Sequence, residues 1–281
     1  MASAWRTGCS LLFWGFFAIS SILLFPLAVL VWALTAPFDR RLRCQHRFTS
    51  WWASLYTWAN PLWRVRVEGR ERMRPDTTYV MISNHQSFLD ILVLFRLRAH
   101  FKWVSKAEMF RIPCIGWNMA LNRYVKLVRG DGASIARMMA ACEQHLAEGS
   151  SVLLFPEGTR SMDGRLKPFK HGAFTLAQRA GVGILPIVVE GTADALPKHG
   201  FVLRGRHAIR VRVLDEVPFA AIAERPVEAV VADFEALYAR VLGEPPPRLR
   251  AAAAGFAPAR TAAEMPPVPP AASSAPSGAP S

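Results

Sequence analysis

A long uncharged run near the amino terminus constrains this chain more than any other feature. From Thr7 to Phe38 there is no Asp, Glu, Lys or Arg. As one helix this run would be about 48 Å long, against a membrane hydrocarbon core of about 30 Å. It also exceeds the apolar stretch of a signal peptide, which is about 7–15 residues. Residues 1–38 are therefore predicted to be a membrane anchor, either one tilted span or a hairpin that folds back at Pro26.

The charges around this run predict its orientation. The formal net charge of +13 fits contact with anionic lipid headgroups. Nucleic acid is not an expected partner, because no zinc-finger spacing or RRM-like signature accompanies the charge. Basic residues next to a membrane anchor stay on the cytoplasmic side, so the chain after residue 40 is expected to face the cytoplasm from the cytoplasmic membrane. Arg6 alone precedes the run, whereas Arg40, Arg41, Arg43 and Arg47 follow it.

Residues 39–63 form a basic and aromatic segment. Amphipathic aromatic side chains prefer the headgroup layer of a membrane, which predicts an interfacial segment. A core helix of the following domain is the alternative. The aromatic residues concerned are Trp51, Trp52, Tyr56, Trp58 and Trp63.

Residues 64–243 alternate between strand-like and helix-like patterns. This alternation predicts an α/β domain with a largely parallel central sheet flanked by helices. In such a domain, ligands bind beyond the carboxyl ends of the strands. Residues 244–281 are rich in Ala, Pro and Ser and are predicted to be disordered. The expected strands are 64–68, 78–83, 101–104, 124–128, 152–155, 184–189 and 208–214, and the expected helices are 88–97, 134–147, 172–180 and 227–242.

The first chemical motif is Ser83–Asp90, directly after an expected strand. His85 would stand at the carboxyl end of that strand, and Asp90 would lie in the first turn of the next helix. This spacing lets the carboxylate reach one ring nitrogen and leaves the other free to take a proton. A structural interpretation stays open, because Ser87 with Asp90 three residues later resembles a helix capping box.

The second motif is Phe155–Ser161, again directly after an expected strand. Gly158 lets the backbone approach a ligand closely, and Arg160 offers a planar fork of donors that matches phosphate oxygens. Glu157 either anchors the turn or bonds a substrate hydroxyl. The alternative is a strand-ending turn with a solvated ion pair. Further cations that would suit a phosphorylated acceptor are Lys106, Arg129, Lys167 and Lys170.

The two motifs together resemble those of the 1-acylglycerol-3-phosphate O-acyltransferase family. Asn84 to Asp90 matches the family motif N-H-x-x-x-x-D, and Phe155–Ser161 matches F-P-E-G-T-R-S. The resemblance covers about Val65 to Val213, although the segment 116–129 departs from the commonest family form. Further segments that resemble the family are Lys106–Glu108, Pro113–Gly116 with Arg129, and Leu185–Gly191.

This resemblance implies a membrane-bound enzyme of phospholipid synthesis. It would transfer a fatty acyl group from a thioester to the sn-2 hydroxyl of 1-acylglycerol 3-phosphate, giving phosphatidic acid. His85 would be the general base and Asp90 its orienting partner. The residues implied to bind the acceptor are Glu157, Gly158, Thr159, Arg160, Lys106 and Arg129.

No cofactor or metal ion is expected for this reaction. The partners would be membrane lipids, lysophosphatidic acid, and either acyl-CoA or acyl carrier protein as donor. Direct transfer is the simplest scheme, because no Ser or Cys nucleophile is paired with His85. The four cysteines are widely scattered, which argues against a zinc site or a disulfide framework. The alternatives are an acyltransferase for another lysolipid, either a lysophospholipid or a lyso-aminolipid, and a non-catalytic membrane protein that binds anionic lipids.

Overall fold

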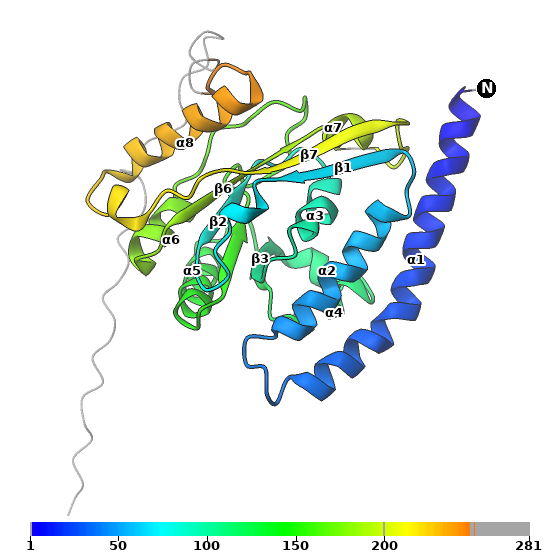
Figure 1. Ribbon diagram of the computed structural model, residues 1–281, viewed down its shortest axis with the longest axis horizontal. Coiled ribbons are helices and arrows are strands. Elements are labelled where there is room, and N and C mark those ends of the chain that lie inside the picture. The colour runs from blue at the N-terminus through cyan, green and yellow to red at the C-terminus, as the bar shows by residue number, and fades with distance from the viewer. Residues whose placement is uncertain (1, 199, 248–249, 251–281) are drawn as a thin grey trace, which may run out of the picture. The chain divides into compact units, whose positions relative to one another are not determined.

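The computed structural model describes residues 2–198, 200–247 and 250. Within them a seven-stranded sheet has the strand order β1-β7-β6-β2-β5-β3-β4. Neighbouring strands run parallel except for the antiparallel pair β6 and β7, which confirms the predicted α/β fold with a largely parallel sheet (Figure 1). The strands are β1 (Trp63–Glu68), β2 (Val80–Ser83), β3 (Phe101–Lys106), β4 (Val125–Leu127), β5 (Ser151–Leu154), β6 (Ile184–Glu190) and β7 (His207–Val213).

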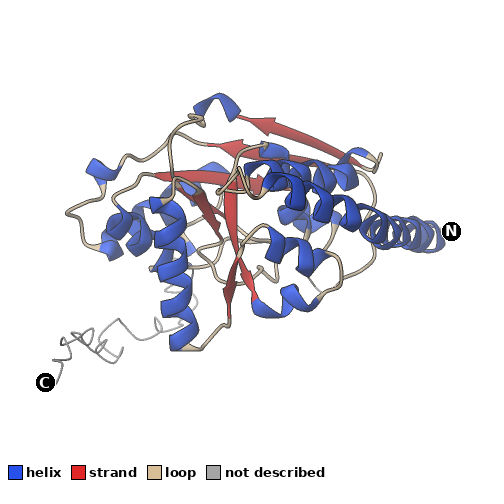
Figure 2. Cartoon of the chain, turned by 90° about the horizontal axis from the view of Figure 1, so that it is seen from below, coloured by secondary structure: helices blue, strands red, loops and turns tan. Residues whose placement is uncertain are grey.

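Helices lie on both sides of the sheet (Figure 2). Successive side chains of a strand point to opposite faces, so in β2 Met81 packs into one apolar core while Val80 and Ile82 pack into the other. Burial on both faces explains why this strand is apolar without alternation. The helices are α1 (Ala2–Thr35), α2 (Arg43–Trp58), α3 (Leu89–Leu94), α4 (Ile115–Leu121), α5 (Gly132–Ala147), α6 (Gly172–Ala180), α7 (Thr192–Ala195) and α8 (Val227–Leu242).

The observed elements follow the sequence patterns closely. A strand or helix overlaps every expected range, although 88–97 divides into α3 and a 3-10 turn at Phe95–Leu97. Helices α4 and α7 were not expected from the sequence. They have seven and four residues, which is too short for a clear helical period. Most of the predicted disordered tail lies outside the described residues, so it and the domain boundaries stay predictions.

The uncharged amino-terminal run forms the single helix α1, which continues through Pro26. The alternative of a hairpin that folds back at Pro26 is therefore wrong, and the ribbon only bends towards its carboxyl end (Figure 1). One side of α1 is buried against the domain, with Phe13 7% and Ala28 0% exposed. The other side presents apolar residues such as Leu12 and Leu23. By length and composition α1 is apolar enough to cross a membrane.

The aromatic residues of the predicted interfacial segment, which lie on α2 and at the start of β1, divide into buried and exposed ones. Trp52, Tyr56 and Trp63 are at most 4% exposed and belong to the apolar core, whereas Trp51 and Trp58 are 45% and 41% exposed. The interfacial interpretation is wrong for the three buried residues. It failed because polar residues such as Gln45 and His46 also face inward here, which hides the core-facing side of the helix from a sequence pattern.

Candidate active site

The two sequence motifs meet because their strands are neighbours. Strands β2 and β5 pair in parallel with Ile82 opposite Leu154, so the loops that follow them leave the same edge of the sheet. Two hydrogen bonds join these loops directly. The backbone amide of His85 donates to Glu157 Oε1 at 2.7 Å, and the amide of Ser161 donates to the His85 carbonyl at 2.8 Å.

His85 and Asp90 form the pair that the spacing predicts. His85 Nδ1 lies 2.8 Å from Asp90 Oδ2, and the Asp90 side chain is fully buried. Among the described residues Nε2 has no hydrogen-bond partner, and the ring borders a cavity. The ring of Phe155 stacks on the imidazole with 3.9 Å between centroids and 10° between planes. The pair therefore presents one ring nitrogen to the cavity and holds the other on a carboxylate.

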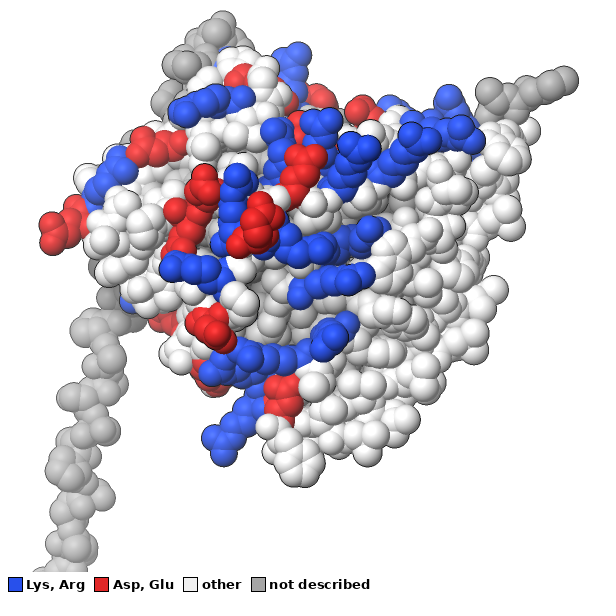
Figure 3. Space-filling model, viewed as in Figure 1, with Lys and Arg blue, Asp and Glu red and all other residues white. Residues whose placement is uncertain are grey.

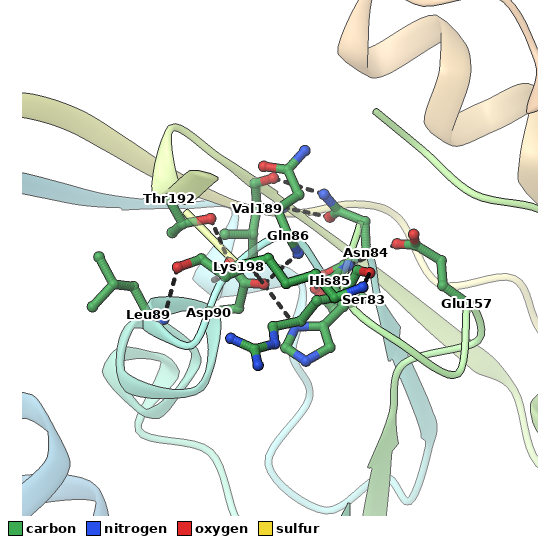
Figure 4. Close-up of polar contacts among 12 residues, drawn as sticks. Ser83, Asn84, His85, Gln86, Leu89, Asp90, Glu157, Val189, Thr192 and Lys198 are labelled. Carbon is green, nitrogen blue, oxygen red and sulfur yellow. Dashed lines mark hydrogen bonds and ion pairs between the residues drawn. The ribbon is translucent and has the colours of Figure 1, made fainter. Parts of the chain in front are cut away.

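The Asp90 carboxylate is fixed by four donors. Besides His85, the backbone amides of Gln86 and Ser87 donate to Oδ2 at 2.6 and 2.8 Å. The Thr192 hydroxyl donates to Oδ1 at 2.5 Å (Figure 4). The capping contact and the predicted His–Asp contact are thus both present, since the same carboxylate accepts from the backbone of the first turn and contacts the imidazole. The catalytic role of the pair stays a prediction.

Asn84 and Thr192 show how the sheet supports this pair. The Asn84 side-chain amide exchanges two hydrogen bonds of 2.8 Å with the backbone of Val189 in β6. Thr192 follows Gly191, whose φ of 81° and close approach to the Ala208 carbonyl exclude a side chain. The segment Leu185–Gly191, which resembles the family, therefore positions Thr192 next to Asp90.

Glu157 anchors the second loop rather than facing the cavity. Its Oε1 accepts from the His85 amide, and Oε2 accepts from the Lys167 amide at 3.1 Å. The residue is 3% exposed and does not line the cavity. Burial raises the pKa of Glu157 to about 8, although both amides oppose that shift. Of the two roles left open by the sequence, the structure shows the turn anchor.

Gly158 determines the conformation of the turn between Glu157 and Arg160. Its φ is 71°, and a Cβ there would come within 3.0 Å of the Lys170 side chain. The next two residues, Thr159 and Arg160, then reach the cavity. Gly158 therefore acts through the backbone conformation, and it does not line the cavity itself.

The cavity has a volume of about 370 Å³ and two chemically different kinds of lining residue. The apolar ones come from α1, α2, α3 and β3 and include Phe17, Trp52, Leu92 and Trp103. Four cations also belong to the lining: Lys106, Arg129, Arg160 and Lys198. His85 belongs to the same lining.

The cations of this cavity influence each other. Burial lowers the pKa of Arg160, Asp90 opposes the shift, and Arg129 adds to it. Burial likewise lowers the pKa of Lys198, with Lys167, Arg160 and Arg129 contributing. Mutual repulsion of this kind favours the binding of an anion that neutralises several cations at once.

The structure thus brings five predicted site residues to one cavity. These are His85, Lys106, Arg129, Thr159 and Arg160.

Sequence reasoning missed two further residues of this site. Lys198 donates to the Arg160 carbonyl at 2.8 Å and follows α7 without any motif of its own. Thr192 could have been found from the sequence, because it directly follows Leu185–Gly191, a segment that resembles the family. Among the described residues, no group of three or more His, Cys, Asp or Glu side chains could hold a metal ion.

Comparison with known proteins agrees with the family that the two motifs resemble. The chain matches the family described as Acyltransferase over residues 64–190. It is 43% identical over 187 residues to a 1-acyl-sn-glycerol-3-phosphate acyltransferase of Chlamydomonas reinhardtii, covering 65% of this chain and 56% of that protein. With the chloroplastic protein of that name from Arabidopsis thaliana the identity is 42%, over 64% of this chain and 50% of the relative. The chain therefore spans about half the length of these relatives.

A solved structure shares the fold. The crystal structure of the 1-acyl-sn-glycerophosphate acyltransferase PlsC from Thermotoga maritima superposes with a TM-score of 0.73. The match covers 89% of this chain and 98% of that one, at 22% sequence identity. At this identity the similarity supports the architecture, including the sheet and the helices around it.

Proposed function

We propose that this protein transfers a fatty acyl group from a thioester to the sn-2 hydroxyl of 1-acylglycerol 3-phosphate, forming phosphatidic acid. The observation that carries this proposal is the shared cavity, whose lining combines a histidine with a free Nε2, a set of apolar side chains and four cations. An acyl chain matches the apolar side chains and a phosphate matches the cations. The names of the similar proteins agree with this substrate.

In the proposed reaction His85 acts as general base. Nε2 takes the proton of the acceptor hydroxyl while that oxygen attacks the thioester carbonyl. Collapse of the tetrahedral intermediate forms the ester C–O bond and breaks the C–S bond, and the imidazolium returns its proton to the leaving thiolate. Asp90 holds Nδ1–H and stabilises the positive charge that develops on the ring.

The cations would position the acceptor by its phosphate. Arg160 can make a bidentate contact, and Arg129, Lys106 and Lys198 would add to the charge. Glu157 and Gly158 would contribute indirectly, by holding the loop that presents Arg160. The donor would be acyl-CoA or acyl carrier protein, and no other cofactor enters the scheme.

The packing of α1 supports a position within one leaflet of the membrane. The helix lies along the domain, and its Ser20 and Ser21 hydroxyls form hydrogen bonds of 3.1 Å with the Tyr56 hydroxyl of α2. Because one side of α1 packs on the domain and the other side is apolar and exposed, the helix has only one side available to lipid, unlike a spanning helix that lipid surrounds. We therefore propose that α1 lies in the cytoplasmic leaflet, with the cavity opening towards its lipids.

An assay with purified full-length protein in detergent micelles tests the substrate. Acceptors would include 1-acylglycerol 3-phosphate, lysophospholipids with larger headgroups and a lyso-aminolipid, each with acyl-CoA and with acyl carrier protein. Turnover of the first acceptor, with loss of turnover in His85→Ala, is the expected result. Preference for another lysolipid would replace the acceptor, and binding without turnover of any acceptor would favour the non-catalytic alternative.

A further inference from the structure

Helix α2 forms a wall of two separate cavities. Thr49, Trp52 and Tyr56 face the catalytic cavity. The other side of the helix lines a second cavity of about 480 Å³, together with the turn before β3. The residues of α2 that line this second cavity include a stripe at helical spacing: Arg43, Arg47, Ser50, Ser54 and Trp58.

Three guanidinium groups line the second cavity without an acidic partner. Arg43, Arg47 and Arg98 form no ion pair with any described residue, and no Asp or Glu belongs to the lining. The acid nearby, Asp39, accepts a 2.7 Å hydrogen bond from the Cys44 amide at the start of α2. Three like charges around one hollow repel each other, so an anion placed among them would be favoured.

One residue that lines the second cavity has an unused hydrogen-bond donor. Ser54 is 1% exposed, and within the described part of the chain its hydroxyl has no hydrogen-bond partner. Leaving a buried hydroxyl unpaired is unfavourable, because the group has lost its hydrogen bonds to water. An oxygen acceptor bound in the cavity would remove this cost, which makes phosphate oxygens suitable for both the serine and the arginines.

The surroundings of the second cavity indicate where its ligand comes from. Trp51 and Trp58 line it and are 45% and 41% exposed, and the Arg98 guanidinium lies 5.7 Å from the centre of the Trp58 ring. Figure 3 shows that Lys and Arg side chains gather next to the broad uncharged surface where α1 lies. Exposed tryptophan beside arginine, next to an apolar surface, is typical of the headgroup layer of a membrane.

We propose that the second cavity binds the phosphate of an anionic membrane phospholipid. Arg43, Arg47 and Arg98 would surround the phosphate, Ser54 would donate to it, and the exposed tryptophans would lie against the glycerol and the first part of the acyl chains. This site is separate from the catalytic cavity and goes beyond the proposed function. A lipid held there would fix α2, and with it one wall of the catalytic cavity, to the membrane surface.

Binding of short-chain lipid to the full-length protein in non-ionic detergent tests this site. The probes are dioctanoyl phosphatidylglycerol and inorganic phosphate, titrated with tryptophan fluorescence and thermal melting as readouts. The Arg47→Gln/Arg98→Gln variant should bind phosphatidylglycerol at least about tenfold more weakly. The matched control Arg64→Gln/Arg66→Gln removes two exposed arginines of β1 and should bind like the parent.

Two further variants separate this site from folding and from catalysis. Ser54→Ala breaks no internal hydrogen bond, so it should melt like the parent and bind several-fold more weakly. Arg160→Ala should bind phosphatidylglycerol normally, and this readout does not depend on turnover. If the Arg64→Gln/Arg66→Gln control loses as much affinity for phosphatidylglycerol, the lipid is held by diffuse charge attraction. If Arg160→Ala loses affinity, the lipid binds in the catalytic cavity. If inorganic phosphate binds as tightly as the lipid, the site takes a free anion. Each of these results would overturn the proposal.

Discussion

Replacing Asp90 by Asn separates the two roles of this carboxylate. In the structure Oδ2 accepts from His85 Nδ1–H and from two backbone amides, whereas Oδ1 accepts from the Thr192 hydroxyl. An asparagine must therefore place its oxygen at the Oδ2 position, because an NH₂ group there would face two backbone N–H donors. Its NH₂ group would then donate to Thr192, whose hydroxyl can turn to accept. The tautomer of His85 should survive, and only the negative charge should be lost.

The size of the effect follows from that charge. Two unit charges about 4 Å apart interact by about 4 kcal/mol at an effective dielectric constant of about 20. With roughly half of the proton transferred in the transition state, Asp90→Asn should lose about 2 kcal/mol, or about 30-fold in kcat. His85→Ala removes the base itself and should lose about 10²–10⁴-fold.

The measurement is kcat of both variants, with thermal melts to confirm folding. A second comparison uses Thr192→Val, which cannot accept from the asparagine NH₂ group. Thr192→Val should therefore cost more in the Asp90→Asn background than in the parent. If Asp90→Asn is as inactive as a folded His85→Ala protein, the tautomer is not preserved and the argument is wrong. If its kcat is unchanged, the charge of Asp90 has no role in the reaction.

Three other results follow from the structure. Arg160→Ala should raise the KM for the acceptor about 10- to 100-fold, and Arg160→Lys should recover part of that loss. A rise confined to the KM for the donor would show that this motif binds the acyl thioester instead of the acceptor. Because the pKa of Glu157 is raised to about 8 in the folded state, the free energy of unfolding should fall as pH rises from about 4.5 to 8. Glu157→Gln should flatten this pH dependence. An unchanged dependence of the melting temperature on pH in this variant would refute the raised pKa of Glu157. The thiol introduced by Trp5→Cys should react with a membrane-impermeant maleimide from the cytoplasmic side, as Cys44 should, whereas a spanning α1 would place it on the opposite side.

Much of the fold could be predicted because local patterns carry it. The strands around the two motifs are short apolar runs bounded by polar residues, and parallel strands buried on both faces have this pattern in any context. The helices α5, α6 and α8 each repeat apolar residues over two or more turns. Helix α2 was harder, because its buried side carries Gln45, His46 and Thr49, whose partners lie more than fifty residues away.

What the sequence by itself determined is which residues the site contains: a histidine with a carboxylate five residues later and a Gly-Thr-Arg turn. It also determined that the chain has a long uncharged segment near its amino terminus. These features depend on residues close together in the chain. Only the tertiary structure decided that Glu157 braces the loop from behind, that Thr192 and Lys198 complete the site, and that α1 lies along the domain. Each of these depends on contacts between residues distant in sequence, such as Asp90 with Thr192 or Ser20 with Tyr56. Such contacts form only when the sheet order brings β2, β5 and β6 together, and no local pattern encodes that order.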